Sequence, residues 1–186
     1  GMGKATAKLA IANDARVNIV GRSQDKLNRT LDELSSPNLT ASQLDMTDQD
    51  AVQEFFRTQG DESIDGLIIS ASTAVHGTFA ETETEDVKEM FNSKFFGPYR
   101  LARQALPKMR DGSAISFFSG VLSSRPSSYA GMPEAAREGM FASVAGSLPL
   151  KRVADAEDIA QAALFLTTNP FTTGHVLDVD GGHLIG

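Results

Sequence analysis

Residues 1–23 of the chain, GMGKATAKLAIANDARVNIVGRS, decide how the fold is interpreted. Two glycines open a stretch, Gly3–Asn13, whose apolar spacing predicts a helix, and the β-branched run Val17–Val20 predicts a strand directly after it. A helix that begins at glycines and leads into a buried strand is typical of a parallel α/β unit. We therefore expect a parallel sheet with helices on both of its faces.

The rest of the chain continues this alternation. Capping-box patterns at residues 47–50 and 82–85 are expected to start helices, and the second of these helices runs to about Met109 with a kink at Pro98. The remaining predicted elements are helices at Gln24–Leu34, Pro133–Ser147 and Ala156–Thr167, and strands at Leu39–Leu44, Gly66–Ser70, Ser113–Phe118 and Val176–Val179. The predicted fold class is α/β, three-layer αβα, with a single domain over residues 1–186.

The composition describes an acidic globular domain. The 186 residues hold 17 lysines and arginines against 24 aspartates and glutamates, and no cysteine. Thiolate zinc sites and cysteine nucleophiles are therefore excluded, and the three histidines show no metal-ligand spacing, so no metal is expected. The lack of a basic stripe argues against a nucleic-acid partner. The lack of a long apolar run and of a leader predicts a cytoplasmic protein with no membrane partner.

The glycine pair at the start of the first helix is a candidate phosphate site. Without Cβ atoms, Gly1 and Gly3 let backbone N–H groups and the positive end of the helix approach a pyrophosphate. This is the arrangement of a doubly wound, Rossmann-type dinucleotide-binding fold. Ordinary turn glycines would give the same pattern, so both interpretations stand at this point.

Arg22, about 20 residues after the glycines, favours the nucleotide interpretation. At the end of the second strand of such a fold, a carboxylate selects NAD, whereas an arginine accepts the 2′-phosphate of NADP. The strand here ends Val20-Gly21-Arg22-Ser23, without a carboxylate. Because a guanidinium makes bidentate contacts with phosphate, the sequence predicts a preference for NADP over NAD. A solvated surface arginine is the alternative.

Several motifs together resemble the short-chain dehydrogenase/reductase family. Besides the glycines and the Gly21-Arg22 turn, they include Leu44-Asp45-Met46-Thr47 after the following strand. The tail is the most specific part and comprises Leu148–Val153, Glu157–Ala160, Leu164–Leu166, Thr173-Gly174 and Val179–Gly182. The resemblance covers essentially the whole chain. It implies a dinucleotide-dependent oxidoreductase that assembles as a homodimer or homotetramer.

The resemblance also assigns binding roles to individual residues. It implies that the coenzyme phosphates are bound at Gly1, Met2, Gly3, Arg22 and Ser23. It also implies that Asp45 and Met46 lie against the adenine, and that Ser70 and Ala71 form the wall of the coenzyme cleft. The motif around Ser70 departs from the family's Asn-Asn-Ala-Gly, because Ile69 and Ser72 replace its first and last residues and change the local turn chemistry.

Two segments that such a fold needs are missing from the 186 residues. No strand precedes Gly1, although the first strand is central in the order 3-2-1-4-5-6, and its loss leaves a gap between the strands at Val17 and Gly66. Near Tyr129 the chain is too short for the helix and strand that should follow Phe118. We expect the natural protein to be longer, with both missing segments disordered beside the coenzyme cleft.

The acid/base pair of the family is absent as well. In the family, a lysine four residues after a tyrosine lowers the pKa of that tyrosine, whereas Tyr129 is followed by Pro133. The pair either lies in the missing segment or has been lost. By resemblance, Ser119 takes the place of the serine that binds the substrate oxygen. Lys94 stands where the family has asparagine, so it contacts coenzyme or substrate, alters the proton route, or lies on the surface.

These residues predict an NADP-preferring oxidoreductase that transfers hydride between the nicotinamide and a small carbonyl or alcohol substrate. One alternative is a catalytically inactive dinucleotide-binding sensor or subunit on the same scaffold, which Lys94, Gly120 and Pro133 motivate. A flavodoxin-like or receiver-type signalling domain shares the alternating pattern. It does not explain the ending Asp180-Gly181-Gly182.

Overall fold

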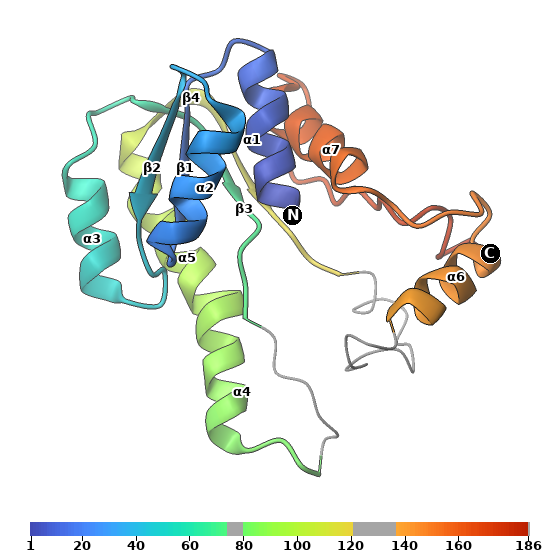
Figure 1. Ribbon diagram of the computed structural model, residues 1–186. Helices are drawn as coiled ribbons and strands as arrows, with labels where there is room; N and C mark the ends of the chain where they lie inside the picture. The colour runs from blue at the N-terminus through green and yellow to red at the C-terminus, as the bar shows by residue number, and fades with distance from the viewer. Residues whose placement is uncertain (74–79, 121–136, 186) are drawn as a thin grey trace.

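The computed structural model describes residues 1–73, 80–120 and 137–185 (Figure 1). Its α-helices are α1 (Met2–Ala12), α2 (Gln24–Leu34), α3 (Gln49–Arg57), α4 (Thr84–Phe91), α5 (Gly97–Ala105), α6 (Arg137–Ser147) and α7 (Ala156–Thr168). The π-helix η1 (Asn92–Phe96) and the 3-10 helix η2 (Leu106–Lys108) flank α5. The strands are β1 (Val17–Gly21), β2 (Leu39–Gln43), β3 (Ile64–Ile69) and β4 (Met109–Phe117). Among the described helices, none has the length and apolar character needed to cross a bilayer.

The strands form parallel pairs, as the βαβ pattern predicts. Strand β1 runs beside β2 with Val17 opposite Leu39, and β3 runs beside β4 with Ile69 opposite Phe117. Within the described part of the chain these are two separate two-stranded sheets. A doubly wound sheet without its first strand should have this arrangement, because that strand normally lies between β1 and β3. The gap predicted from the sequence is therefore present in the structure.

Helices cover both faces of the strand pairs, so the predicted αβα layering is confirmed. Helices α1, α2 and α7 pack on one face, and α3 and α5 pack against each other on the opposite face (Figure 1). Close packing of α7 requires Gly66 in β3, since an added Cβ would lie 2.5 Å from Cγ2 of Thr167. On the face covered by α3 and α5, Leu44, Val52, Phe56 and Ala105 form a buried apolar cluster.

The long helix predicted up to Met109 is interrupted rather than simply kinked. Helices α4 and α5 are joined by η1, where the N–H of Gly97 bonds to the carbonyl oxygen of Asn92. Pro98 has no N–H to donate, so the backbone cannot keep the regular α-helical pattern through it. The wider π turn just before the proline accommodates this loss. Strand β4 then begins at Met109, earlier than the predicted start at Ser113.

The predicted capping boxes are wrong in detail. Asp48 caps α3, since its Oδ1 accepts hydrogen bonds of 3.0 Å from both Asp50 N and Ala51 N. The hydroxyl of Thr47 donates instead to Asp45, at 2.7 Å. At α4 the N-cap residue is Glu83, which makes no side-chain capping bond. A short carboxylate in the right position competes successfully with threonine for the first amides of a helix.

The strand predicted at Val176–Val179 does not form. Val176 is 83% exposed, although the β-branched run suggested a buried strand. A parallel strand exists only where a neighbour offers its backbone groups, and none of the described segments does so here. The tail ends in a turn instead, in which Asp180 accepts hydrogen bonds of 2.9 Å from Gly182 N and Leu184 N.

Candidate functional site

The site lies at the edge where the strands end. Figure 1 shows the N-terminal end of α1 and the carboxyl ends of β1 and β3 on the same side of the molecule. Arg22 follows β1 directly, and Ser70 follows β3. In open α/β sheets, ligands bind outside the carboxyl ends of the strands, at the point where the strand order reverses. Here that point is the gap between β1 and β3.

The start of α1 is built to approach an anion. Gly1 is its N-cap and offers no side-chain capping bond, and the first turn contains no acidic residue. The first N–H groups of a helix have no partner within the helix, and they carry its positive dipole end. Gly3 lies against Ser70, since an added Cβ at Gly3 would be 2.9 Å from Oγ of Ser70. The structure thus brings Gly1, Met2 and Gly3 together with Ser70.

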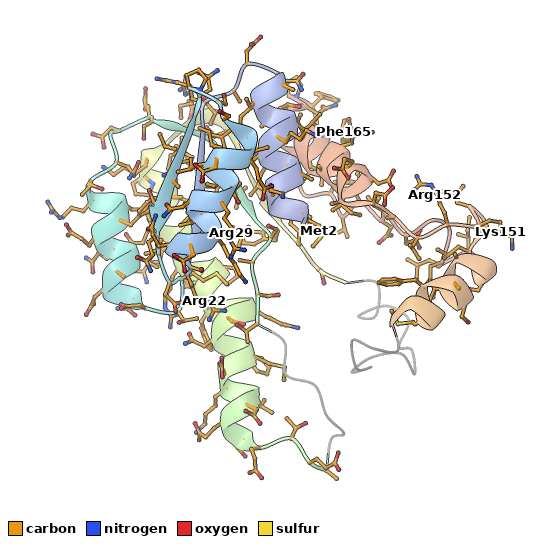
Figure 2. All side chains as sticks on the ribbon, in the orientation of Figure 1. Met2, Arg22, Arg29, Lys151, Arg152 and Phe165 are labelled. Carbon is orange, nitrogen blue, oxygen red and sulfur yellow. The ribbon has the colours of Figure 1, made fainter. Side chains whose placement is uncertain are left out.

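Arg22 is held at two points. The side chain of Gln43 in β2 donates a 2.9 Å hydrogen bond to the Arg22 carbonyl oxygen. The Arg22 guanidinium donates through Nη2 to the hydroxyl of Thr73, at 3.3 Å. Figure 2 shows Arg22 and Met2 toward the same edge of the molecule. An exposed guanidinium at this edge can reach a phosphate beside the first turn of α1.

Ser23 takes part in local structure as well as in the candidate site. It is the N-cap of α2, and its Oγ accepts a 3.4 Å hydrogen bond from Lys26 N. A serine hydroxyl that accepts a bond still has its hydrogen to donate. Ser23 can therefore cap α2 and bind a phosphate oxygen at the same time.

Asp45 and Met46 line the neighbouring part of the edge, after β2. The carboxylate of Asp45 accepts two hydrogen bonds from Thr47, one from its N–H at 2.9 Å and one from its hydroxyl at 2.7 Å. Burial alone would raise the pKa of Asp45, but these bonds and the charge of Arg22 outweigh it and hold the pKa below its usual value. Met46 packs against Gly97, where an added Cβ would lie 2.8 Å from Cγ of Met46.

The candidate substrate side is more open. Ser119 follows the end of β4, and Lys94 lies in η1; both residues are exposed, as is Ala71 after β3. Tyr129 and Pro133 lie outside the described residues. Ser119 and Lys94 are therefore both accessible to solvent.

Two residues of the site were missed in the sequence. They are Ser93, in η1, and Thr73. The Ser93 hydroxyl accepts a 3.0 Å hydrogen bond from Thr73 N and donates a 3.3 Å hydrogen bond to the Thr73 carbonyl oxygen. Ser93 is only 2% exposed. No pattern in the sequence could have paired these residues, because they lie on different elements and neither belongs to a periodic motif.

Comparisons with known proteins agree on one family. The family model described as short chain dehydrogenase matches residues 1–131. Carbonyl reductase family member 4 from Xenopus tropicalis is 24% identical, and the match covers 98% of this chain and 93% of that protein. That match extends over 221 positions, more than the 186 residues of this chain, so the relative has residues at positions where this chain has none.

Solved structures share the fold. A short-chain dehydrogenase/reductase from Brucella melitensis, described as a glucose/ribitol dehydrogenase, gives a TM-score of 0.86 at 22% identity, covering 98% of this chain and 91% of that one. An NADPH-bound short chain oxidoreductase from Pseudomonas aeruginosa PAO1 is described as containing an atypical catalytic center. It gives a TM-score of 0.85 at 25% identity, and the match covers 98% of this chain and 92% of that one. The arrangement of helices and strands is therefore Rossmann-like.

Proposed function

Because this chain belongs to the short-chain dehydrogenase family of NAD(P)-dependent oxidoreductases, we propose that it transfers hydride between NADP(H) and the carbonyl or alcohol carbon of a small molecule. One relative is named a carbonyl reductase, and one solved structure of the same fold contains NADPH. Residues 1–186 form a single coenzyme-binding domain in this proposal. The coenzyme, when bound, supplies or accepts the hydride.

The observation that carries the coenzyme preference is the environment of Arg22. The hydrogen bond of its guanidinium goes to a neutral hydroxyl, that of Thr73, at 3.3 Å. Because this hydrogen-bonding partner is neutral, the guanidinium keeps donors for an incoming anion, although its charge also acts on the nearby carboxylate of Asp45. A carboxylate at this strand end would instead select the ribose hydroxyls of NAD. Arg22 and Ser23 therefore bind the 2′-phosphate.

The start of α1 fits the pyrophosphate. Its uncapped first turn offers backbone N–H donors, and the lack of a Cβ at Gly3 allows this turn to lie close to Ser70. In this proposal Ser70 and Ala71, which directly follow β3, line the coenzyme cleft beside it. Asp45 and Met46 bound the adenine side, where the methionine side chain gives an apolar surface.

On the substrate side, Ser119 donates a hydrogen bond to the carbonyl oxygen as negative charge develops on it. The ammonium of Lys94 lies in η1 and stabilises that charge or a coenzyme phosphate. In this proposal the tyrosine and lysine of the family's acid/base pair belong to a segment missing near Tyr129, because Tyr129 itself is followed four residues later by Pro133.

Assembly into a homodimer or homotetramer is part of the proposal. The helical segment from α4 to η1 exposes Phe91 by 60% and Phe95 by 58%. Exposed aromatic side chains that are close together are typical of an interface. A second copy of the chain would remove both rings from water.

Isotope transfer tests the proposed reaction. NADPH deuterated at C4 of the nicotinamide is incubated with the full-length protein and a panel of aldehydes and ketones, and the alcohols are analysed by mass spectrometry. The proposal expects deuterium on the carbinol carbon of at least one product. Tight NADPH binding without transfer to any carbonyl in the panel would contradict the enzyme and favour the dinucleotide-binding alternative.

A further inference from the structure

We infer that Thr73 is a positioning residue that presets the Arg22 guanidinium for the 2′-phosphate, and that buried Ser93 holds Thr73 in the required place. The inference rests on the proposed function, because it assumes that Arg22 binds this phosphate. It adds a determinant of coenzyme choice that lies outside the strand-end motif. Thr73 and Arg22 are 51 residues apart in the chain and meet only in the folded molecule.

Arg22 needs such support because its side chain is long and exposed. A free arginine loses much conformational freedom when it binds a phosphate, and a residue that fixes the guanidinium beforehand reduces this loss. Gln43 fixes the backbone of Arg22 through its carbonyl oxygen. Thr73 fixes the other end, at Nη2 of the guanidinium. The backbone of Arg22 and the guanidinium at the end of its side chain are thus both oriented before a ligand arrives.

The chemical type of the partner matters. The Thr73 hydroxyl accepts one N–H of the guanidinium, and the other donors remain for a phosphate. An aspartate or glutamate in its place would neutralise the charge and compete with the phosphate. A threonine hydroxyl orients Arg22 without reducing its attraction for an anion.

Thr73 is itself held from the helical side. Its N–H donates to Ser93 Oγ at 3.0 Å, and Ser93 Oγ lies 3.3 Å from its carbonyl oxygen. Because Ser93 is 2% exposed, water cannot readily replace these bonds. A single buried hydroxyl therefore sets the backbone of the residue that orients Arg22.

The contact joins two segments that are far apart in the sequence. Arg22 follows β1 and Thr73 follows β3, and these strands belong to separate pairs in the described structure. The Arg22–Thr73 hydrogen bond spans the gap between the pairs at the coenzyme edge. It therefore sets the position of the phosphate-binding arm relative to the cleft wall at Ser70.

The test compares Thr73→Val with Thr73→Ser in the full-length protein. Valine keeps the shape of threonine but loses the hydroxyl, whereas serine keeps the hydroxyl. Dissociation constants for NADPH and NADH are measured by fluorescence titration. Thr73→Val is expected to weaken NADPH binding by about threefold to tenfold, the effect of one hydrogen bond, and to leave NADH binding unchanged. Thr73→Ser is expected to keep the preference of the unmodified protein for NADPH over NADH.

Arg22→Ala separates this inference from the proposed function. If Thr73 acts through Arg22, Thr73→Val has no further effect on NADPH binding in the Arg22→Ala background. Ser93→Ala is expected to reproduce the selective loss of NADPH affinity. If Arg22→Ala lowers NADPH affinity selectively but Thr73→Val does not, the positioning role is wrong and the phosphate site stands. If Arg22→Ala changes both coenzymes equally or neither, the phosphate site fails, and the positioning role fails with it.

Discussion

At the scale of single residues, the proposed site depends on one residue without a side chain and one with a long, charged side chain. Gly3 lets the first turn of α1 approach the cleft wall, and Arg22 provides charge at the end of β1. Both were recognisable in the sequence, because glycine before a helix and arginine after a strand each have a physical reason. Thr73 and Ser93 could not be recognised in the sequence, because their roles depend on hydrogen bonds to residues that are distant in the sequence and meet only in the folded chain.

Gly3→Ala tests the close approach at the start of α1. The added Cβ would lie 2.9 Å from Ser70 Oγ, so Ser70 has to shift into the cleft. Because the proposal places the pyrophosphate of both coenzymes at this turn, the displacement is expected to weaken NADPH and NADH binding equally, by about tenfold, which corresponds to about 1.4 kcal/mol. Calorimetric titration of each coenzyme measures the effect.

Gly146→Ala is the matched control for this variant. Gly146 lies in helix α6, and no atom lies within 4 Å of an added Cβ there. It is expected to leave coenzyme affinity unchanged. Equal affinities for Gly3→Ala and the unmodified protein would show that the coenzyme does not approach this turn.

At the scale of elements, helices were more predictable than strands. Helix α2 has the predicted bounds, Gln24–Leu34, because a capping serine and an amphipathic pattern act within the segment itself. The strand predicted at Val176–Val179 failed because strand formation depends on a neighbour that sequence periodicity does not reveal. The π turn before Pro98 shows a further limit, since a proline predicts a disturbance but not its geometry.

The start of α7 gives a prediction on acid stability. Asp158 accepts two hydrogen bonds from Arg152, at 2.5 and 2.8 Å, and one from Asp155 N at 2.8 Å. These bonds lower the pKa of Asp158 from 3.8 to about 2. Because the folded-state pKa lies below the ordinary value, the contribution is complete above pH 3.8 and is lost as the pH falls toward about 2.

Asp158→Asn is therefore expected to lower the urea midpoint of unfolding at neutral pH. The difference in urea midpoint between this variant and the unmodified chain should become smaller once the pH falls below 3.8, the ordinary pKa of this carboxyl group. Denaturation curves for both proteins over this pH range measure it. If the difference in urea midpoint stays constant down to a pH of about 2, the charge of Asp158 does not stabilise the start of the helix.

At the scale of the whole molecule, the gap between the strand pairs is the dominant feature. The chain keeps the helices of both outer layers, while β1 and β3 present edges to each other without pairing in the described structure. The sequence predicted this gap, because the order of elements in a doubly wound fold leaves only one place for the absent strand. The proposed coenzyme site lies at the open end of the same gap.

Hydrogen exchange can test whether the gap is open in solution. In β1, Val17 N donates to Asn38 O, so Val17 and Ile19 face β2, while Val20 faces the gap. In the 186-residue chain, the Val20 amide is expected to exchange much faster than that of Ile19, as resolved by NMR. Equal protection of both amides would mean that another strand, such as one from a second copy, occupies the gap.

The central claim is that the start of α1 and Arg22 together bind the phosphates of NADP(H). A crystal structure of the full-length protein grown with excess NADPH tests it most directly. The account predicts the pyrophosphate at the backbone N–H groups of Met2 and Gly3, and the 2′-phosphate within hydrogen-bond distance of Arg22. NADPH bound elsewhere, or with its 2′-phosphate pointing away from Arg22, would contradict it.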